Sequence, residues 1–341
     1  VCSSDLALKV ESPGSNLKIL NRSDSKLLPY QVKFDFFTFF KGSLFKYLRD
    51  SIKILKENDS SSIILVAGDP WTSFLFSVFF RLFLKKARIQ VQFHGDVFTP
   101  KWKYQNFKFL LKFISLIPAV FLANQIRLVS NAQKISFDKV FPRFLNKTFV
   151  SPVPYSLKFE SNKIAKVKKE NVFNFAFVGR IEFDRGIVYL ISIMKRSLSL
   201  DIPFYLHVIG DGSKRNWLEK KLEEIGLTQK FIFHGNLETN FLIETLQKMD
   251  VLLNLTEFES YGRSVREALM LDLPVITFES TGIKDLLVAT RSNAIQIITS
   301  PEDLSIEKID NARNFIGDEA LKTLIRQERT LGIQELIRSW I

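Results

Sequence analysis

Short apolar runs that end in polar, glycine-containing loops recur along this chain and alternate with segments of helical periodicity. In the second half these runs are, in order, NFAFVGR, PFYLHVIGDG, KFIFHG, DVLLNL and PVITFES. Apolar strands that alternate with helices are typical of a parallel sheet covered by helices on both faces. We expect helices from about Ile187, over 214–226 and over 240–249, and mostly helical structure without a further strong strand over 306–341.

The first half of the chain shows the same alternation. Three runs have the pattern of buried strands, namely SSIILVAGDP from residue 61, ARIQVQFHGD (87–96) and IRLVSN (126–131). Between the first two, polar residues recur at every fourth position over 73–85. This spacing predicts a helix with one water-facing stripe, formed by Ser73, Ser77, Arg81 and Lys85. Polar residues at spacings of four and three predict a second helix over 101–117.

The length of the chain predicts two domains, because single cores stop growing near ~250–300 residues and this chain has 341. Prolines followed by a lysine-rich polar stretch predict a linker over 152–171. The expected domains are therefore 1–151 and 172–320, with a C-terminal helical segment over 321–341. Before residue 60 only ESPGSNLKIL is a candidate strand, and it is weak. We therefore expect the first strand of the N-terminal domain to be missing from this sequence.

The two halves differ in charge. Residues 1–170 contain 28 Lys and Arg against 12 Asp and Glu (28 − 12 = +16), and residues 171–341 contain 20 against 24 (20 − 24 = −4). A basic first half favours an anionic partner, which is an acidic lipid, a phosphorylated acceptor or a nucleic acid. Cys2 is the single cysteine, which excludes an internal disulfide framework and favours an intracellular location. No apolar run reaches the ~18–20 residues of a membrane span.

Two interpretations of the basic helices in the first half stay open. They can cover the sheet and present lysines to water. Alternatively, the aromatic surface around Trp102, Tyr104, Phe107 and Phe109 enters a lipid interface while lysines contact anionic headgroups. Binding to nucleic acid is less favoured, because no recognised binding motif accompanies these basic residues.

The stretch TEFESYGRSVREALML (256–271) predicts a ligand site. It follows the strand DVLLNL, and its helix is expected to begin at Gly262. A helix N-terminus attracts anions. Glu259 in the loop and Glu267 about one turn inside the helix can reach the same cleft, and each carboxylate can accept two hydrogen bonds from the hydroxyls of a sugar. Either glutamate alone could simply complement the helix dipole.

Two arginines follow the strand NFAFVG in one predicted loop. Arg180 and Arg185 can clamp a diphosphate, since the guanidinium fork matches phosphate oxygens. A surface salt bridge to Glu182 or Asp184 is the alternative. The turn HVIGDGS, which contains Gly210, lets the backbone approach a ligand closely, although such a turn often only reverses the chain.

Taken together, FVGRIEFDRGI, VIGDGSKRNWLE, FIFHGN and ESYGRSVREALMLDLPVI resemble the retaining glycosyltransferases of the GT-B fold, family GT4 (glycosyl transferases group 1), over roughly 172–290. The resemblance implies two doubly wound Rossmann-like domains that face each other across a cleft. It implies transfer of a hexose-type sugar from a nucleotide-sugar donor to a glycan or lipid-linked acceptor. Bacterial cell-surface polysaccharide or glycolipid synthesis, at the cytoplasmic face of the membrane, is the expected setting.

The resemblance also implies roles for particular residues. Arg180 and Arg185 would hold the donor diphosphate, Glu267 the ribose, and Glu259 the transferred sugar. The other donor-binding candidates are Gly179, Gly210, Tyr261, Gly262, Arg263 and Ser264. His94, in QFHGD, resembles a strand-end histidine beside the reacting sugar, and a structural histidine at the edge of the core is nearly as well supported.

Several departures from the family pattern are visible. Asp272 replaces a glycine after the helix, and Thr281-Gly282 with Asp285 replaces a double glycine and a glutamate. No Asp-x-Asp pair occurs, so no metal is expected, and no Gly-x-Gly-x-x-Gly predicts a dinucleotide cofactor. A catalytically inactive or truncated relative that only binds ligands is the alternative function.

Overall fold

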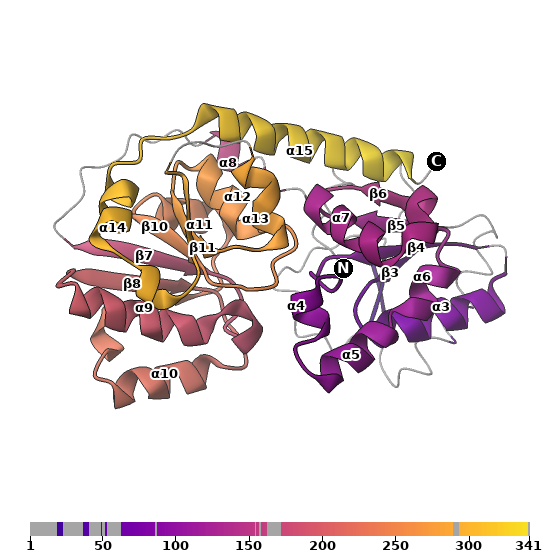
Figure 1. Cartoon of the computed structure of the whole chain (residues 1–341), viewed down its shortest axis with the longest axis horizontal. Coiled ribbons are helices and arrows are strands. Elements are labelled where there is room, and N and C mark those ends of the chain that lie inside the picture. Colours follow the sequence, from indigo (N-terminus) through magenta and orange to yellow (C-terminus); the bar gives the residue numbers. More distant parts are fainter. Residues whose placement is uncertain are drawn as a thin grey trace. The chain divides into compact units, whose positions relative to one another are not determined.

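The computed structural model describes residues 19–22, 37–40, 49, 52, 63–85, 87–153, 155–156, 158–161, 172–288 and 293–339. The chain forms two compact units (Figure 1). Unit 1 is Val1–Pro154 with Leu331–Ile341, and unit 2 is Tyr155–Thr330. Helix α15 (Glu319–Arg338) begins in unit 2 and ends in unit 1, so unit 1 consists of two pieces of the chain. Part of the expected linker, 162–171, lies outside the described residues.

Unit 2 contains a parallel sheet of six strands. They are β7 (Phe173–Val178), β8 (Phe204–Ile209), β9 (Phe231–Gly235), β10 (Val251–Asn254), β11 (Val275–Phe278) and β12 (Ile295–Ile298). Their order is β12-β11-β10-β7-β8-β9, and every neighbouring pair is parallel. This order confirms the doubly wound prediction. The sequence analysis missed β12, because its four residues stand without the longer apolar run that marked the other strands.

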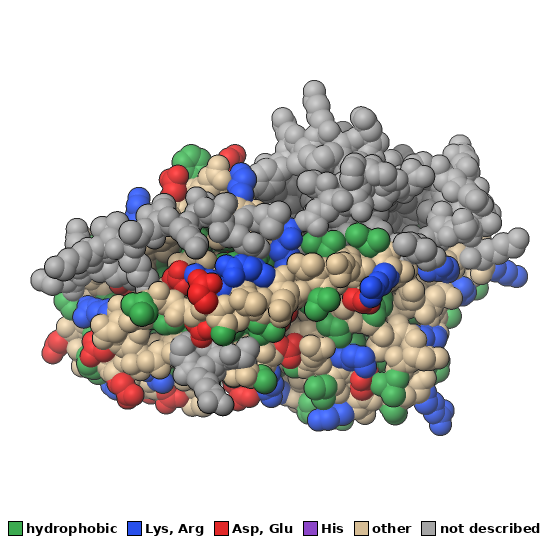
Figure 2. Space-filling model, turned by 90° about the horizontal axis from the view of Figure 1, so that it is seen from above, with side chains coloured by type: hydrophobic (Ala, Val, Ile, Leu, Met, Phe, Trp, Pro, Cys, Tyr) green, Lys and Arg blue, Asp and Glu red, His purple; other side chains and the backbone are tan. Residues whose placement is uncertain are grey.

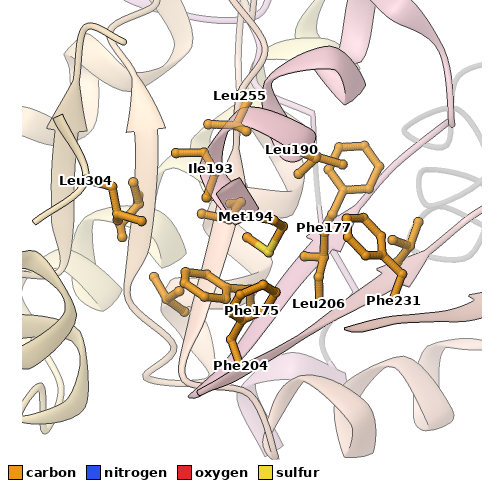
Figure 3. Close-up of a cluster of buried hydrophobic side chains, with 14 of the residues drawn as sticks. Phe175, Phe177, Leu190, Ile193, Met194, Phe204, Leu206, Phe231, Leu255 and Leu304 are labelled. Carbon is orange, nitrogen blue, oxygen red and sulfur yellow. The ribbon is translucent and has the colours of Figure 1, made fainter. Parts of the chain in front are cut away.

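Helices cover both faces of this sheet. They are α9 (Ile187–Ser199), α10 (Arg215–Glu224), α11 (Thr239–Leu246), α12 (Arg263–Met270), α13 (Thr281–Leu287) and α14 (Ile306–Arg313). One core contains buried residues of α9, α10 and α14 and the inward side chains of β7 and β8, such as Phe175, Phe204 and Leu206 (Figure 3). The second core contains apolar residues of α11, α12, α13 and α15. The opposite faces of the strands are thus both buried, as their continuous apolar sequences predicted.

Unit 1 contains a parallel four-stranded sheet in the order β3-β4-β5-β6. Its strands are β3 (Ile63–Ala67), β4 (Arg88–Phe93), β5 (Gln125–Leu128) and β6 (Thr148–Val150), and its helices are α3 (Thr72–Phe83), α4 (Pro100–Lys103), α5 (Phe107–Ile114), α6 (Ile117–Leu122) and α7 (Asn131–Val140). A separate parallel pair joins β1 (Ile19–Arg22) to β2 (Phe37–Phe40), and β1 overlaps the weak candidate ESPGSNLKIL. No helix within the described ranges is long and apolar enough to cross a bilayer.

Two expectations about the helices of unit 1 were wrong. The first half of the polar stripe of α3 faces inward: Ser73 and Ser77 are fully buried, whereas Leu82 is 66% exposed. Arg81 is half-buried and Lys85 is exposed. The helix expected over 101–117 is interrupted, because α4 ends at Lys103 and Asn106 caps α5 by accepting from the backbone amide of Phe109. A side-chain cap at Asn106 starts a new helix, which the polar spacing alone could not reveal.

A buried polar network attaches the end of α15 to the sheet of unit 1. The Arg127 guanidinium is fully buried and donates to Gln92 Oε1 at 3.0 Å and to Ser151 O at 3.0 Å. Gln90 Nε2 donates to Ser339 Oγ at 3.0 Å. Ser151 Oγ donates to the carbonyl of Gly332 at 2.7 Å. The C-terminal piece of the chain is therefore held on unit 1 by hydrogen bonds to residues that lie far away in sequence.

Two histidines in unit 2 make stability depend on pH. His207 Nδ1 lies 2.9 Å from His234 Nε2, and the two rings stack. Burial, together with the neighbouring His234, lowers the pKa of His207 to about 4, and burial lowers the pKa of His234 as well. Because the unfolded chain binds more protons below the ordinary histidine pKa of ~6.5, unfolding becomes easier as the pH falls from about 6.5 toward 4.

We predict that His207→Gln reduces this loss of stability at acid pH, because glutamine does not take up a proton in the unfolded chain. The measurement is the free energy of unfolding in urea at pH 7 and at pH 5 for the wild type and the variant. A difference between the two pH values that is as large in His207→Gln as in the wild type would contradict the assignment. The variant His234→Gln should also reduce the difference in unfolding free energy between pH 7 and pH 5.

Candidate functional site

The strand order places two loops of unit 2 at a position suited to binding a ligand. Strands β7 and β10 are neighbours, but the chain continues from β7 to β8 on one side and from β10 to β11 on the other. In open α/β sheets, ligands bind beyond the carboxyl ends of the strands where the strand order reverses in this way. The loop after β7 (179–186) and the loop after β10 (255–262) both start at this reversal point.

Glycines let the backbones of these loops approach closely. A Cβ atom on Gly186, whose φ is +76°, would lie 2.1 Å from the carbonyl oxygen of Leu255 at the end of β10. A Cβ atom on Gly210, whose φ is +129°, would lie 2.0 Å from the carbonyl oxygen of Gly179. Real Cβ atoms do not approach oxygen so closely, and positive φ favours glycine. Both contacts therefore require glycine and join neighbouring strand ends.

The close contact at Gly186 brings a predicted arginine to a predicted glutamate. Arg185 Nη1 lies 3.3 Å from Glu259 Oε2, and the Glu259 side chain is 15% exposed. The backbone oxygen of Glu259 also accepts from Gly282 N at 2.7 Å. The other arginine behaves differently: Arg180 pairs with Asp184 at 3.2 Å, and both side chains are more than half exposed. For Arg180 the surface salt bridge, left open by the sequence, is what the structure shows.

Helix α12 begins at the predicted place. Gly262 precedes its first residue with a φ of +74°, so Arg263 and Ser264 lie in its first turn and Tyr261 lies just before it. Glu267, one turn further, is 4% exposed, and its Oε1 accepts from Arg263 Nε at 2.8 Å. Burial raises the pKa of Glu267, and the Arg263 guanidinium opposes this rise. The start of α12 thus combines helix amides, a guanidinium and a buried carboxyl group.

The sequence analysis missed Arg266, which fixes the backbone of this site. Its side chain is fully buried and donates to the carbonyl of Tyr261, to Gly282 O at 3.2 Å, and to both carboxylate oxygens of Glu328 on α15 at 2.7 Å and 3.1 Å. Its guanidinium also lies 3.7 Å from the centre of the Tyr261 ring. One feature of the sequence could have indicated that Arg266 is buried. It follows Val265 on a helix that must bury its apolar face.

Gly282 explains one departure from the family pattern. A Cβ atom on Gly282 would lie 2.4 Å from the amide nitrogen of Tyr261. The single glycine of Thr281-Gly282 therefore stands where the backbone of the site needs it. The other departure, Asp272, adopts a φ of +57° and pairs with Lys322 at 2.6 Å. An ion pair thus accompanies the backbone conformation that a glycine would adopt more easily.

His94 belongs to unit 1, where it follows β4 and is half-buried. The next residue along is held in place, because Gln133 Nε2 donates to Gly95 O at 2.9 Å. Within unit 2, the structure brings together Arg185, Glu259 and the start of α12. The role of His94 beside a reacting sugar stays a prediction.

Comparison with known proteins agrees with this arrangement. Residues 158–314 match the family model described as Glycosyl transferases group 1, and this range contains every site residue of unit 2 named above except Glu328. The 2-deoxystreptamine glucosyltransferase of Streptomyces kanamyceticus is 31% identical over 175 residues, which is 46% of this chain and 45% of that protein. The 2-deoxystreptamine N-acetyl-D-glucosaminyltransferase of Niallia circulans is 21% identical over 79% of this chain and 68% of that protein. The chain therefore spans less than half the length of the first of these relatives.

Solved structures share the fold over most of the chain. The lipopolysaccharide outer core galactosyltransferase WaaB has a TM-score of 0.66 at 16% identity, and the alignment covers 99% of this chain and 94% of that protein. Anabaena HepE in complex with UDP-glucose has a TM-score of 0.66 at 15% identity, with coverages of 89% and 85%. These likenesses establish the GT-B fold that the sequence motifs predicted.

We predict that Arg266→Leu destabilises unit 2 by about 3–5 kcal/mol, because it leaves the largely buried carboxylate of Glu328 without its partner. The measurement is the free energy of unfolding in urea. The double variant Arg266→Leu/Glu328→Leu should recover part of the loss, since it removes both charges.

An exposed ion pair provides the control for this prediction. Arg215 and Glu219 pair at 2.9 Å with side chains 35% and 43% exposed, so Arg215→Leu should cost no more than about 1 kcal/mol. Equal effects of Arg266→Leu and Arg215→Leu would show that the buried pair does not organise the site.

Proposed function

We propose that the chain transfers a hexose-type sugar from a nucleotide-sugar donor to a glycan or lipid-linked acceptor, because residues 158–314 match the family model described as Glycosyl transferases group 1. The observation that carries the proposal is the pairing of Arg185 with Glu259 at the reversal point of the unit 2 sheet. Cationic and hydroxyl-binding groups lie side by side there, as a molecule with a diphosphate next to a sugar requires.

The chemistry of each group suits one part of a nucleotide sugar. Arg185 offers a planar fork for diphosphate oxygens, and Glu259 can accept hydrogen bonds from the hydroxyls of the transferred sugar. Glu267, held by Arg263 at 2.8 Å, is the group for the ribose hydroxyls. Arg263 keeps the buried carboxyl group of Glu267 in one orientation. The ribose hydroxyls would therefore meet a hydrogen-bond acceptor that is already in position. The phosphate would be bound by backbone amides at the start of α12, contributed by Tyr261, Gly262 and Ser264.

Catalysis would rest mainly on electrostatic stabilisation of the departing diphosphate. Negative charge develops on the phosphate oxygen as its bond to the sugar breaks, and the first-turn amides of α12 together with Arg185 are placed to stabilise it. The acceptor would attack an oxocarbenium-like sugar from the face that the phosphate leaves, which retains the anomeric configuration. No protein base is assigned, and neither a metal ion nor a cofactor is part of the proposal.

The biological setting is proposed from the relatives and from the charge of the first half. WaaB, a structural neighbour, is named for its part in lipopolysaccharide. We propose a comparable role in bacterial cell-surface polysaccharide or glycolipid synthesis, at the cytoplasmic face of the membrane. The net charge of +16 over residues 1–170 (28 − 12) suits a phosphorylated lipid-linked acceptor.

We predict that Glu259→Ala abolishes both sugar transfer and hydrolysis of the nucleotide sugar while the protein stays folded. The lost carboxylate would no longer orient the sugar, and the fold should persist because the Glu259 backbone keeps its bond from Gly282 N. The measurement is release of nucleoside diphosphate, with circular dichroism to check folding. Glu302→Ala, on an exposed surface of unit 2, is the matched control.

Unchanged turnover in Glu259→Ala would exclude this site as the catalytic one. A wild-type protein that binds a nucleotide sugar but shows no turnover with any acceptor or water would favour the inactive, ligand-binding relative instead.

We predict that a UDP- or GDP-sugar raises the melting temperature of the wild type, because a ligand that binds only the folded state stabilises it. A screen of both nucleotide classes by thermal shift identifies the donor. In Arg185→Ala the shift should shrink, since the diphosphate loses a charged donor. Arg338→Ala, a residue with a 72% exposed side chain, should keep the full shift, and loss of the shift in this control would contradict the assignment of Arg185.

A further inference from the structure

One surface of unit 1 combines exposed apolar side chains with lysines. We call it the α3/α5 surface and define it by Leu75, Leu82 and Phe83 of α3 and Phe107, Leu111 and Ile114 of α5. Their exposed fractions are 45%, 66%, 51%, 73%, 39% and 48%, in that order. Single exposed apolar residues are normal, but a group of this size marks an interaction surface.

A helix that covers a sheet in water normally buries its apolar residues and exposes its polar ones. Helix α3 instead buries two serines and exposes large apolar side chains. Ser73 and Ser77 are fully buried, and within the described part of the chain their hydroxyl groups have no hydrogen-bond partner. Phe83 and Leu82 face outward instead. Burying unpaired hydroxyls costs free energy, and exposing leucine and phenylalanine forfeits the gain of burial. This pattern is consistent with a sheet-covering helix whose outer face meets an apolar environment.

Hydrogen bonds place the helices of this surface next to one another. Trp71 N, at the start of α3, donates to Ser115 Oγ at the end of α5 at 3.0 Å. At the other end of α3, Arg81 Nη2 donates to Leu122 O at the end of α6 at 2.7 Å. Helix α3 therefore lies along α6 and begins where α5 ends. The exposed residues of α3 and α5 belong to neighbouring parts of one unit.

The charges around this surface are mostly positive. Residues 69–138 contain ten Lys and Arg, of which Arg127 is buried, and three acidic residues. Of the acidic residues, Asp69 is exposed just before α3, Asp96 is buried, and Asp138 pairs with Lys134. On α4 and α5, Lys103 lies 4.5 Å from the centre of the Tyr104 ring and Lys112 lies 4.5 Å from that of Phe109. Such lysines pack their stems along apolar surface and extend their charge beyond it. On the face seen from above in Figure 1, which is not the α3/α5 surface, Figure 2 also shows lysine and arginine side chains beside hydrophobic ones.

The residues that form this surface are not all those that the sequence predicts. Trp102 is 8% exposed and packs edge-on against Phe109, so it belongs to the core and not to the outer face. Phe107 and Tyr104, at 73% and 66% exposure, do lie outside. Helix α3, for which the sequence predicted a polar stripe facing water, contributes Leu75, Leu82 and Phe83 to the apolar area.

We propose that the α3/α5 surface binds to the surface of a bilayer that contains anionic lipids. Its aromatic and aliphatic side chains enter the region between headgroups and acyl chains, and its lysines contact the headgroups. A nucleic acid would use the lysines but leave the leucines and phenylalanines in water. This inference concerns unit 1 alone and does not depend on the chemistry proposed for unit 2.

The test is sedimentation of the full chain with vesicles of phosphatidylcholine alone and of phosphatidylcholine with phosphatidylglycerol. We expect binding to the anionic vesicles that weakens as salt rises. Lys101→Glu/Lys108→Glu should weaken binding by at least tenfold, since each lysine near a membrane contributes about 1 kcal/mol, or roughly fivefold. Both positions lie in first helical turns, where an acidic side chain is compatible with the helix.

A second variant tests the apolar contribution. Leu82→Ser/Phe107→Ser replaces the two most exposed apolar residues of the surface and should also weaken binding at least tenfold. Phe241→Ser, at a residue of unit 2 that is 58% exposed, is the matched control and should bind as the wild type does. Circular dichroism and the thermal shift with donor establish that each variant is folded.

Three outcomes would overturn the proposal. The first is a wild type that does not sediment with anionic vesicles. The second is equal binding by the wild type and both double variants. The third is tight, salt-sensitive binding of DNA or RNA that Lys101→Glu/Lys108→Glu abolishes while Leu82→Ser/Phe107→Ser leaves it unchanged, since this would assign the surface to nucleic acid. A failure of vesicle binding with an intact donor shift would leave the proposed function of unit 2 in place.

Discussion

The candidate site depends on one buried guanidinium. Arg266 is removed from water and therefore requires partners, and it finds them in the carbonyls of Tyr261 and Gly282 and in the carboxylate of Glu328. These partners come from the loop before α12, the start of α13 and helix α15. Because a buried charge tolerates no missing partner, the three segments are held together. The backbone of the ligand loop is thus fixed before any ligand arrives.

The sequence predicted those features that local patterns encode. The alternation of apolar runs and helices gave the parallel sheet of unit 2, and Gly262 marked the start of α12. The strand order was not predicted, and it is this order that brings the loops of Arg185 and Glu259 next to each other. The 3.3 Å distance between them depends on the backbone contact of Gly186 with Leu255, which no local pattern expresses.

The failures of sequence interpretation have one physical cause. Polar side chains at helical spacing were assigned to water, yet Ser73 and Ser77 of α3 are buried. Arg266 was likewise overlooked because a buried charge is recognised only through partners from distant segments. Hydrophobic periodicity indicates that a helix has two faces, but the neighbours in space decide which face is inside. Asn106 shows the complementary case, since a single capping side chain divided one expected helix into two.

The division of unit 1 into two pieces has a consequence for how the protein forms. Gln90 and Ser151 receive their partners from Ser339 and Gly332, which are separated from them by 249 and 181 positions. During synthesis all of unit 2 emerges from the ribosome before those partners do. Unit 2 is continuous in sequence and can fold once it has emerged, whereas unit 1 makes these contacts only after Gly332 and Ser339 have followed. The sheet of unit 1 therefore gains these hydrogen bonds only after all of unit 2 has been made.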